Sequence, residues 1–194
     1  MIGPRPHPLL RLVDRLIVFL AAINRPVASF GRDLSGLLVA AMVALALAQI
    51  LSRALFDFTL DWAEELARFA LVWTVLLVAP YAYREGANVA IGSFAAALPA
   101  RLLLLISAAL NVLAVWICAE LFEESLAFWS RGRTLTASAL AMQMYWVYAI
   151  VPLAFACLML VGVELILRLL RSLACPDPDL LLAGAVPAVK APER

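Results

Sequence analysis

The sequence predicts an all-α integral membrane protein with four transmembrane helices. Apolar residues make up 65% of the 194-residue chain and charged residues only 15%, whereas a soluble domain is close to half apolar. Four mainly apolar stretches are about as long as a helix that crosses the roughly 30 Å hydrocarbon core of a bilayer. We place these spans at about residues 34–52, 62–83, 100–120 and 142–168, within a membrane domain over residues 34–172.

The segment before the first span, residues 1–33, is basic and only partly apolar. From Leu9 to Ile23, apolar residues recur every three or four positions, which predicts an amphipathic helix. A secretory signal peptide would have a similar basic start and short apolar core. However, Asn24-Arg25-Pro26 follows at once, without a clean small-residue cleavage site. We therefore favour a helix that lies in the membrane interface.

The first span is rich in alanine and glycine, and its one strongly polar side chain is Gln49. Small residues allow helices to approach closely, so this span is expected to face other helices. Gln49 is expected to hydrogen bond to a neighbouring helix.

The second span has the most distinctive polar pattern. Residues 69–83 carry no charge but are too few to cross a bilayer, so the span must include part of Trp62–Arg68. That places Glu64, Glu65 and Arg68 at or just inside one membrane face, where charge is costly unless it is paired. Glu64 precedes Arg68 by four residues, which is the spacing of a helical ion pair, and Glu65 is close enough to share Arg68. Trp62 suits the membrane interface.

A short amphipathic segment is expected between the second and third spans. The helix of the third span is expected to continue beyond the membrane through Glu120, Glu123 and Glu124. These carboxylates have two interpretations, a solvated helix end, which we favour, or a cation site or proton relay.

The fourth span contains Pro152 and, near its exit, Glu164 and Arg168 at the spacing of a helical ion pair. Residues 173–194 are rich in proline and predict a flexible cytoplasmic tail.

The distribution of arginines predicts the orientation. With four spans, nine arginines lie on one side and three on the other. The nine are Arg5, Arg11, Arg15, Arg25, Arg32, Arg84, Arg101, Arg168 and Arg171, and the three are Arg53, Arg131 and Arg133. Because positive residues favour the cytoplasmic side, both termini are expected in the cytoplasm.

The sequence lacks the residue patterns of the common catalytic and metal sites. The only histidine, His7, lies outside the spans, so a haem would lack its usual axial ligand. The three cysteines form no metal or disulfide pattern. There is no Ser/His/Asp or Cys/His set and no basic stripe for nucleic acid. We therefore predict no enzyme activity, no cofactor or metal, and no nucleic-acid partner.

The order of motifs over about residues 30–172 resembles the small membrane subunit of tripartite ATP-independent periplasmic (TRAP) transporters, also called the small permease or Q subunit. That family has an aromatic residue, a segment with Glu-Leu and Arg, an apolar run with Trp, a basic residue, His or Asn, and a stretch that ends in Leu-Pro. The similar residues here are Trp62, Glu65 and Arg68 in EELAR, Trp73, Arg84, Asn88 and Leu98-Pro99. The chain departs from the family at Ala79-Pro80, where the family often has Gly, and at Asn88, where it often has His.

The resemblance implies a subunit of a bacterial inner-membrane transporter that performs no chemistry of its own. In such systems a periplasmic binding protein delivers an organic acid or similar solute. A large multi-span permease carries the substrate and ion sites, and the small subunit packs beside it among the membrane lipids. The residues that the resemblance and the charge pattern single out for structure or partner contact are Trp62, Glu64, Glu65, Arg68, Trp73, Arg84 and Asn88. Glu65 and Arg68 are the first candidates, as a pair that orients the second span or meets the partner.

The alternative is a self-sufficient four-span exporter that exchanges protons at a membrane glutamate. Such a protein would need an acid deep in a span. Glu64 and Glu65 lie near a span end, so the sequence favours the accessory subunit.

Overall fold

The computed structural model describes residues 8–86 and 100–174, where the regular elements are all helices. These helices are α1 (Pro8–Phe56), α2 (Asp61–Arg84), α4 (Ala100–Arg131), α5 (Met144–Tyr148) and α6 (Ile150–Ala174). Four stretches are long and apolar enough to cross a membrane, in α1, α2, α4 and the α5–α6 pair, which confirms the four-span prediction. Asn88, the segment predicted between the second and third spans, and the tail from residue 175 lie outside the described residues.

α1 is one continuous helix of 49 residues that joins the predicted interfacial helix to the first span. Pro26 lies inside it. Proline removes one backbone hydrogen bond but is tolerated in a helix when neighbouring groups compensate. At 1.5 Å per residue, α1 measures about 73 Å, more than twice the hydrocarbon thickness of a bilayer. The position of residues 9–23 in the membrane interface stays a prediction.

The boundaries of α2 follow from local chemistry. Asp57 has a φ of 51°, a left-handed conformation that ends α1. α2 then begins with Asp61 and Glu64 in its first turn, where acidic side chains interact favourably with the helix dipole. It ends at Arg84, and Gly86 follows with a φ of 68°, the conformation in which glycine often terminates helices.

α5 and α6 are two parts of one membrane-spanning stretch, separated at Ala149. Pro152 is four residues after Tyr148, the last residue of α5. Because proline has no N–H and its ring crowds the carbonyl four residues earlier, the regular helix is interrupted at this point. The fourth predicted span is therefore made of two helices.

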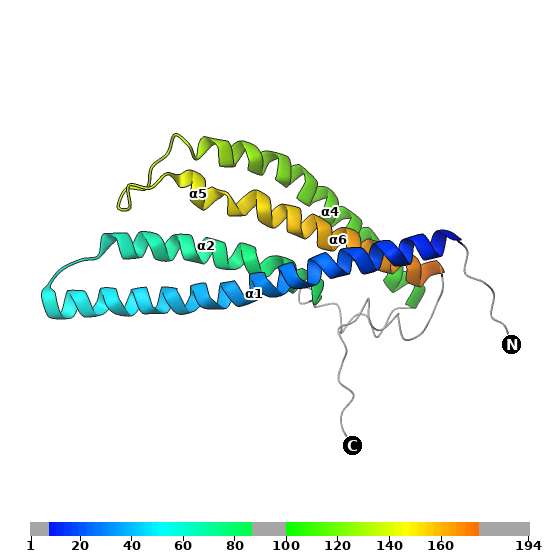
Figure 1. Ribbon diagram of the computed structural model, residues 1–194, viewed down its shortest axis with the longest axis horizontal. Helices are drawn as coiled ribbons and strands as arrows, with labels where there is room; N and C mark the ends of the chain where they lie inside the picture. Colours follow the sequence, from blue (N-terminus) through cyan, green and yellow to red (C-terminus); the bar gives the residue numbers. More distant parts are fainter. Residues whose placement is uncertain (1–7, 87–99, 175–194) are drawn as a thin grey trace, which may run out of the picture.

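The helices form two antiparallel hairpins, α1 with α2 and α4 with α5–α6 (Figure 1). α6 packs against α1, α2 and α4 and is the centre of the molecule. In its most apolar stretch 33% of the residues are buried, whereas none is buried in that of α4. Most of the apolar surface therefore faces outward, as it does in a protein that lipids or a partner surround.

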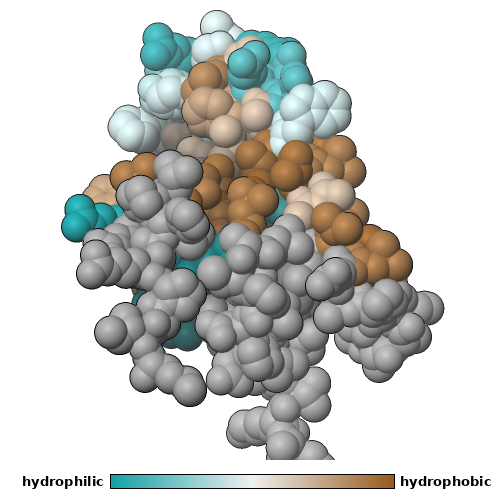
Figure 2. All heavy atoms as spheres, turned by 90° about the vertical axis from the view of Figure 1, so that its right-hand side faces the viewer, coloured by the Kyte–Doolittle hydropathy of each residue, from teal (hydrophilic) through white to brown (hydrophobic). Residues whose placement is uncertain are grey.

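The outward apolar surface is visible from the end of the molecule where α1 begins. Hydrophobic side chains occupy a broad band across this view, and hydrophilic ones gather above it (Figure 2). Large exposed apolar side chains occur along every spanning helix, for example Phe30, Val75, Trp116 and Leu153.

Candidate functional site

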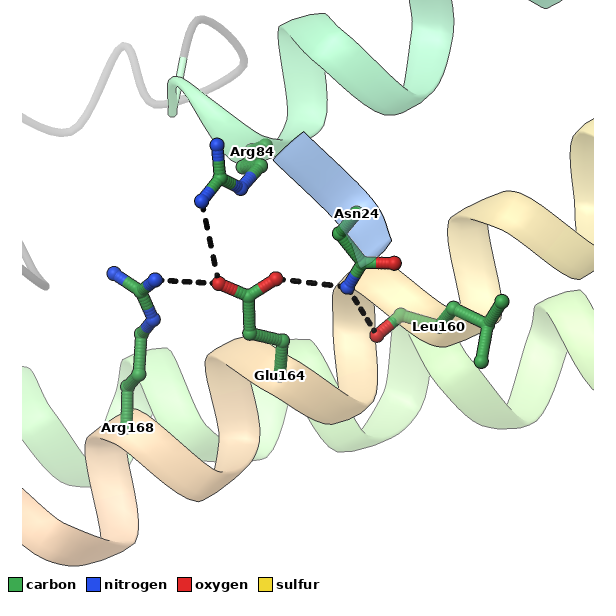
Figure 3. A network of polar contacts seen from close by, with 5 residues as sticks. All are labelled: Asn24, Arg84, Leu160, Glu164 and Arg168. Atoms are coloured by element: carbon green, nitrogen blue, oxygen red, sulfur yellow. Dashed lines mark hydrogen bonds and ion pairs between the residues drawn. The ribbon is translucent and has the colours of Figure 1, made fainter. Parts of the chain in front are cut away.

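Glu164, on α6, is the most deeply buried charged side chain in the described part of the chain, with 1% of its surface exposed. Its Oε2 accepts a hydrogen bond of 2.7 Å from the Asn24 side-chain amide of α1. Its Oε1 pairs with Arg168 one turn along α6 and, at 3.5 Å, with Arg84 of α2 (Figure 3). Asn24 also donates to the backbone carbonyl of Leu160, at 3.1 Å. This cluster therefore joins α1, α2 and α6 through a single carboxylate.

We call Asn24, Arg84, Glu164 and Arg168 the Glu164 cluster. In it, Asn24 of α1 donates a hydrogen bond to the buried carboxylate, and Arg84 of α2 and Arg168 of α6 place positive charge beside it. An isolated buried carboxylate would cost several kcal/mol. The Glu164–Arg168 pair confirms the spacing seen in the sequence. Asn24 was missed as a functional residue, because an asparagine beside Arg25 and Pro26 looks like the end of an apolar run.

A second ion pair links α1 and α6, nearer to the N-terminus of α1 and the C-terminus of α6. Arg171 Nε lies 2.8 Å from an Asp14 carboxylate oxygen, so α6 again contacts the first third of α1. The segment predicted to lie in the membrane interface thus contacts the last span.

At the other end of α2, Glu64 and Arg68 form the predicted ion pair. The pair is exposed, with 55% of the Glu64 and 74% of the Arg68 side-chain surface accessible, and Trp62 is exposed beside them. Exposed ion pairs contribute at most about 1 kcal/mol to stability. The pair is therefore available to a partner and is of little importance for the fold of the chain.

Glu65 does not share Arg68 in the described structure; it binds the connection between α4 and α5 instead. Its carboxylate accepts hydrogen bonds from the backbone N–H groups of Ser138, Ala139 and Leu140, at 3.1, 2.8 and 3.1 Å. The expectation of a Glu65–Arg68 pair was wrong because these backbone donors come from a segment more than 70 residues away. Glu65 thus fixes the start of α2 to the α4–α5 connection.

Two further polar contacts join the two hairpins. The Trp73 indole N–H donates to the carbonyl of Val147 at 3.1 Å, so α2 is joined to α5. The Tyr83 hydroxyl is 2.6 Å from the Asn111 side-chain oxygen, so α2 is joined to α4. Gln49 makes no side-chain hydrogen bond within the described ranges, contrary to expectation, and borders a shallow open pocket on α1.

Glu120, Glu123 and Glu124 lie on the exposed surface of α4. Two contacts join α4 to the α5–α6 pair: Gly162 of α6 faces Val115, and the ring of Tyr148 of α5 lies 4.2 Å from that of Phe128.

The glutamates lie midway between these contacts on α4. We call these three residues the α4 glutamates. They lie at or just beyond the end of the predicted third span, which ends at residue 120.

The residues that the structure describes contain no group of three or more potential metal ligands. Trp62, Glu64, Glu65, Arg68 and Trp73 lie along α2, with Arg84 at its opposite end in the Glu164 cluster. The candidates from Trp62 to Arg68 thus lie near the start of α2, Trp73 near its middle and Arg84 at its end.

Residues 42–172 match the family model described as "Tripartite ATP-independent periplasmic transporters, DctQ component". No similar curated protein and no similar solved structure was found. The matched residues include α2, α4, α5 and nearly all of α6, and they begin within the second half of α1. Because the match covers well over half of the chain, this multi-pass membrane protein belongs to the DctQ family, the small permease component of TRAP transporters.

Proposed function

We propose that this chain packs against a large multi-span permease subunit and supports ion-gradient-driven uptake of an organic acid or similar solute. A periplasmic binding protein delivers the solute, and the complex lies in the bacterial inner membrane with both termini of this chain in the cytoplasm. Family membership supports the kind of partner. The observation that carries the proposal is the outer face of α4, whose most apolar stretch has no buried residue and which carries the exposed α4 glutamates.

The α4 glutamates form an exposed acidic surface next to the exposed apolar part of α4. Helices in membranes associate through close packing of side chains and through hydrogen bonds between polar groups. A large subunit seated on this face of α4 would cover the apolar side chains and supply polar partners for the acids.

The outward direction of these acids favours a partner over a transport site in this chain. A transport site needs a cavity or broken helices near the membrane centre. α4 is unbroken from Ala100 to Arg131, and its most apolar stretch has no buried residue. Its acidic face is therefore a surface on which another protein can pack.

The test is co-purification with the large subunit. Glu123→Leu and Glu124→Leu should remove most of the large subunit from the purified complex, because they delete the polar half of the contact. The chain expressed alone should keep its yield, because both side chains are exposed in it. Glu85→Leu, at an exposed acid after the end of α2, is the matched control and should leave the complex intact. Full recovery of the complex with both leucine variants would contradict the proposal.

Glu64, Arg68 and Trp62 are a second proposed contact, at the end of α2 away from the Glu164 cluster. The ion pair is exposed and adds little to the fold, so its charges are free to meet charged groups of a partner. Arg68→Leu should lower co-purification with the large subunit while the isolated chain keeps its thermal stability. An unchanged complex yield and unchanged uptake would make the pair an ordinary interfacial ion pair.

A further inference from the structure

Arg84, the last residue of α2, is a mostly buried cation with few partners. Its side chain is 19% exposed, and its one contact among the described residues is the 3.5 Å ion pair with Glu164. That distance is at the outer limit of a hydrogen bond. Its Nε is buried and has no hydrogen-bond partner in the described part of the chain. Because a guanidinium offers five N–H donors, most of those of Arg84 lack an acceptor among these residues.

Glu164 has little acceptor capacity left for Arg84, because both of its carboxylate oxygens already accept from closer donors. Its Oε1 also pairs with Arg168, and its Oε2 accepts from Asn24. The two guanidiniums lie on one side of the carboxylate and Asn24 on the other (Figure 3). A second anion on the guanidinium side would give Arg84 the acceptors that Glu164 leaves unfilled.

The position of Arg84 at the end of α2 indicates which anion would be available to it. α2 has 24 residues and is therefore about 36 Å long, slightly longer than the roughly 30 Å hydrocarbon core. Its ends consequently reach the headgroup region, where the anions present in quantity are lipid phosphates. Arg84, Arg168 and the one carboxylate that they share, Glu164, together carry one net positive charge.

We propose that Arg84 binds the phosphate of an anionic phospholipid at the membrane surface where α2 ends. A guanidinium binds phosphate with two parallel hydrogen bonds, a geometry that a bulk counterion cannot match. In the proposed orientation this surface is cytoplasmic, where juxtamembrane basic residues attract anionic lipids. The lipid would then hold the end of α2 against α6. The inference goes beyond the transport role and applies to the chain without its partners.

Native mass spectrometry of the purified full chain tests the lipid site. The chain is incubated with equal amounts of phosphatidylglycerol and phosphatidylethanolamine, and the retained lipid is counted. The wild type should retain phosphatidylglycerol in preference. Arg84→Gln should bind it about fivefold more weakly, the effect of one arginine at a membrane surface. Arg53→Gln, at an exposed arginine in the last turn of α1, is the matched control and should retain wild-type binding.

Two further measurements keep the test decisive if Arg84→Gln folds poorly. The double variant Arg84→Gln/Glu164→Gln removes both charges, so no buried carboxylate loses its partner, and it should also lose the lipid preference. Inorganic phosphate added at millimolar concentration should fail to displace the lipid, whereas displacement would indicate a soluble-anion site. Undiminished phosphatidylglycerol retention by the variants would overturn the proposal. If co-purification of the large subunit falls while retention is unchanged, a carboxylate of that subunit is the anion instead.

Discussion

Glu64 and Glu65, which are adjacent at the start of α2, make different kinds of contact. Glu64 pairs with an exposed arginine of its own helix, and Glu65 accepts three backbone hydrogen bonds from the α4–α5 connection. Hydrogen bonds to a charged group are stronger than neutral ones, and those of Glu65 join two distant segments, whereas the Glu64–Arg68 pair lies within one helix. Glu65 therefore has the larger structural role, although the two residues look equivalent in sequence.

We expect Glu65→Gln to loosen residues 138–140, because the amide side chain offers one neutral acceptor oxygen in place of two charged ones. Amide hydrogen exchange at these positions should accelerate about tenfold. Glu64→Gln is the matched control, since it changes the neighbouring residue in the same way and should leave the exchange unaltered. Equal rates in the two variants would mean that other contacts hold the connection in place.

Pairings within one helix could be predicted from residue spacing, and those between helices could not. The Glu64–Arg68 and Glu164–Arg168 pairs follow from a separation of four residues. The contacts of Asn24 with Glu164 and of Glu65 with Ser138 join residues 140 and 73 positions apart. They depend on which helices pack together and in what register, which no local pattern encodes.

α1 contains two glycines, Gly31 and Gly36, at which substitution by alanine is expected to have opposite effects on stability. A Cβ on Gly31 would lie 2.5 Å from the backbone carbonyl oxygen of Leu77, so α1 and α2 approach closely there. A Cβ on Gly36 would meet nothing within 4 Å. Gly31 is therefore needed for packing, and Gly36 is not needed within the chain.

Gly31→Ala should lower the unfolding temperature of the purified chain by several degrees, because overpacking costs about 1–3 kcal/mol. Gly36→Ala should leave that temperature unchanged or raise it, since alanine is favoured over glycine in a helix by about 0.5–1 kcal/mol. Circular dichroism during heating in detergent measures both. A Gly36→Ala variant that is the less stable of the two would show that α1 and α2 pack differently.

The positions of the helices were easier to predict than their lengths. Apolar runs identified the four spanning stretches, and α2 begins and ends within one residue of its predicted span. Residues 9–23 and the span 34–52 were predicted as separate segments, yet both belong to one helix, α1, which packs against α2 and α6. The α4 glutamates are exposed, and the solvated helix end favoured for them stays a prediction.

For the whole molecule, the nine-to-three distribution of arginines makes a topology prediction. Reporter fusions at residue 90 and at the C-terminus should indicate cytoplasm, and a fusion near Thr134 should indicate periplasm. The two ends of α2 would then face opposite compartments, with Glu65 on the periplasmic side and the Glu164 cluster on the cytoplasmic side. A periplasmic C-terminus would require an odd number of spans.

The arrangement of the polar groups also predicts that this chain alone moves no solute. Side chains in the middle of the helices are already bonded within the protein: Thr74 donates to the carbonyl of Ala70 at 2.8 Å, and Asn111 bonds to Tyr83. The buried acid, Glu164, is bound by Asn24 and two arginines. Coupling a solute to an ion needs polar groups that are accessible from a cavity near the membrane centre. The α4 glutamates are exposed on the surface of α4, at or beyond the end of the predicted third span.

Reconstitution into liposomes tests this prediction. With a sodium or proton gradient and a panel of organic acids, the purified chain should show no gradient-driven flux. Uptake should begin only when the large subunit and the binding protein are added. Flux through the chain alone would contradict the accessory role and favour a small exporter. Glu123→Gln and Glu124→Gln would then identify the path, because an exporter that uses these acids should lose its flux in both variants. If the chain is an accessory subunit, these two variants should lower only its co-purification with the large subunit.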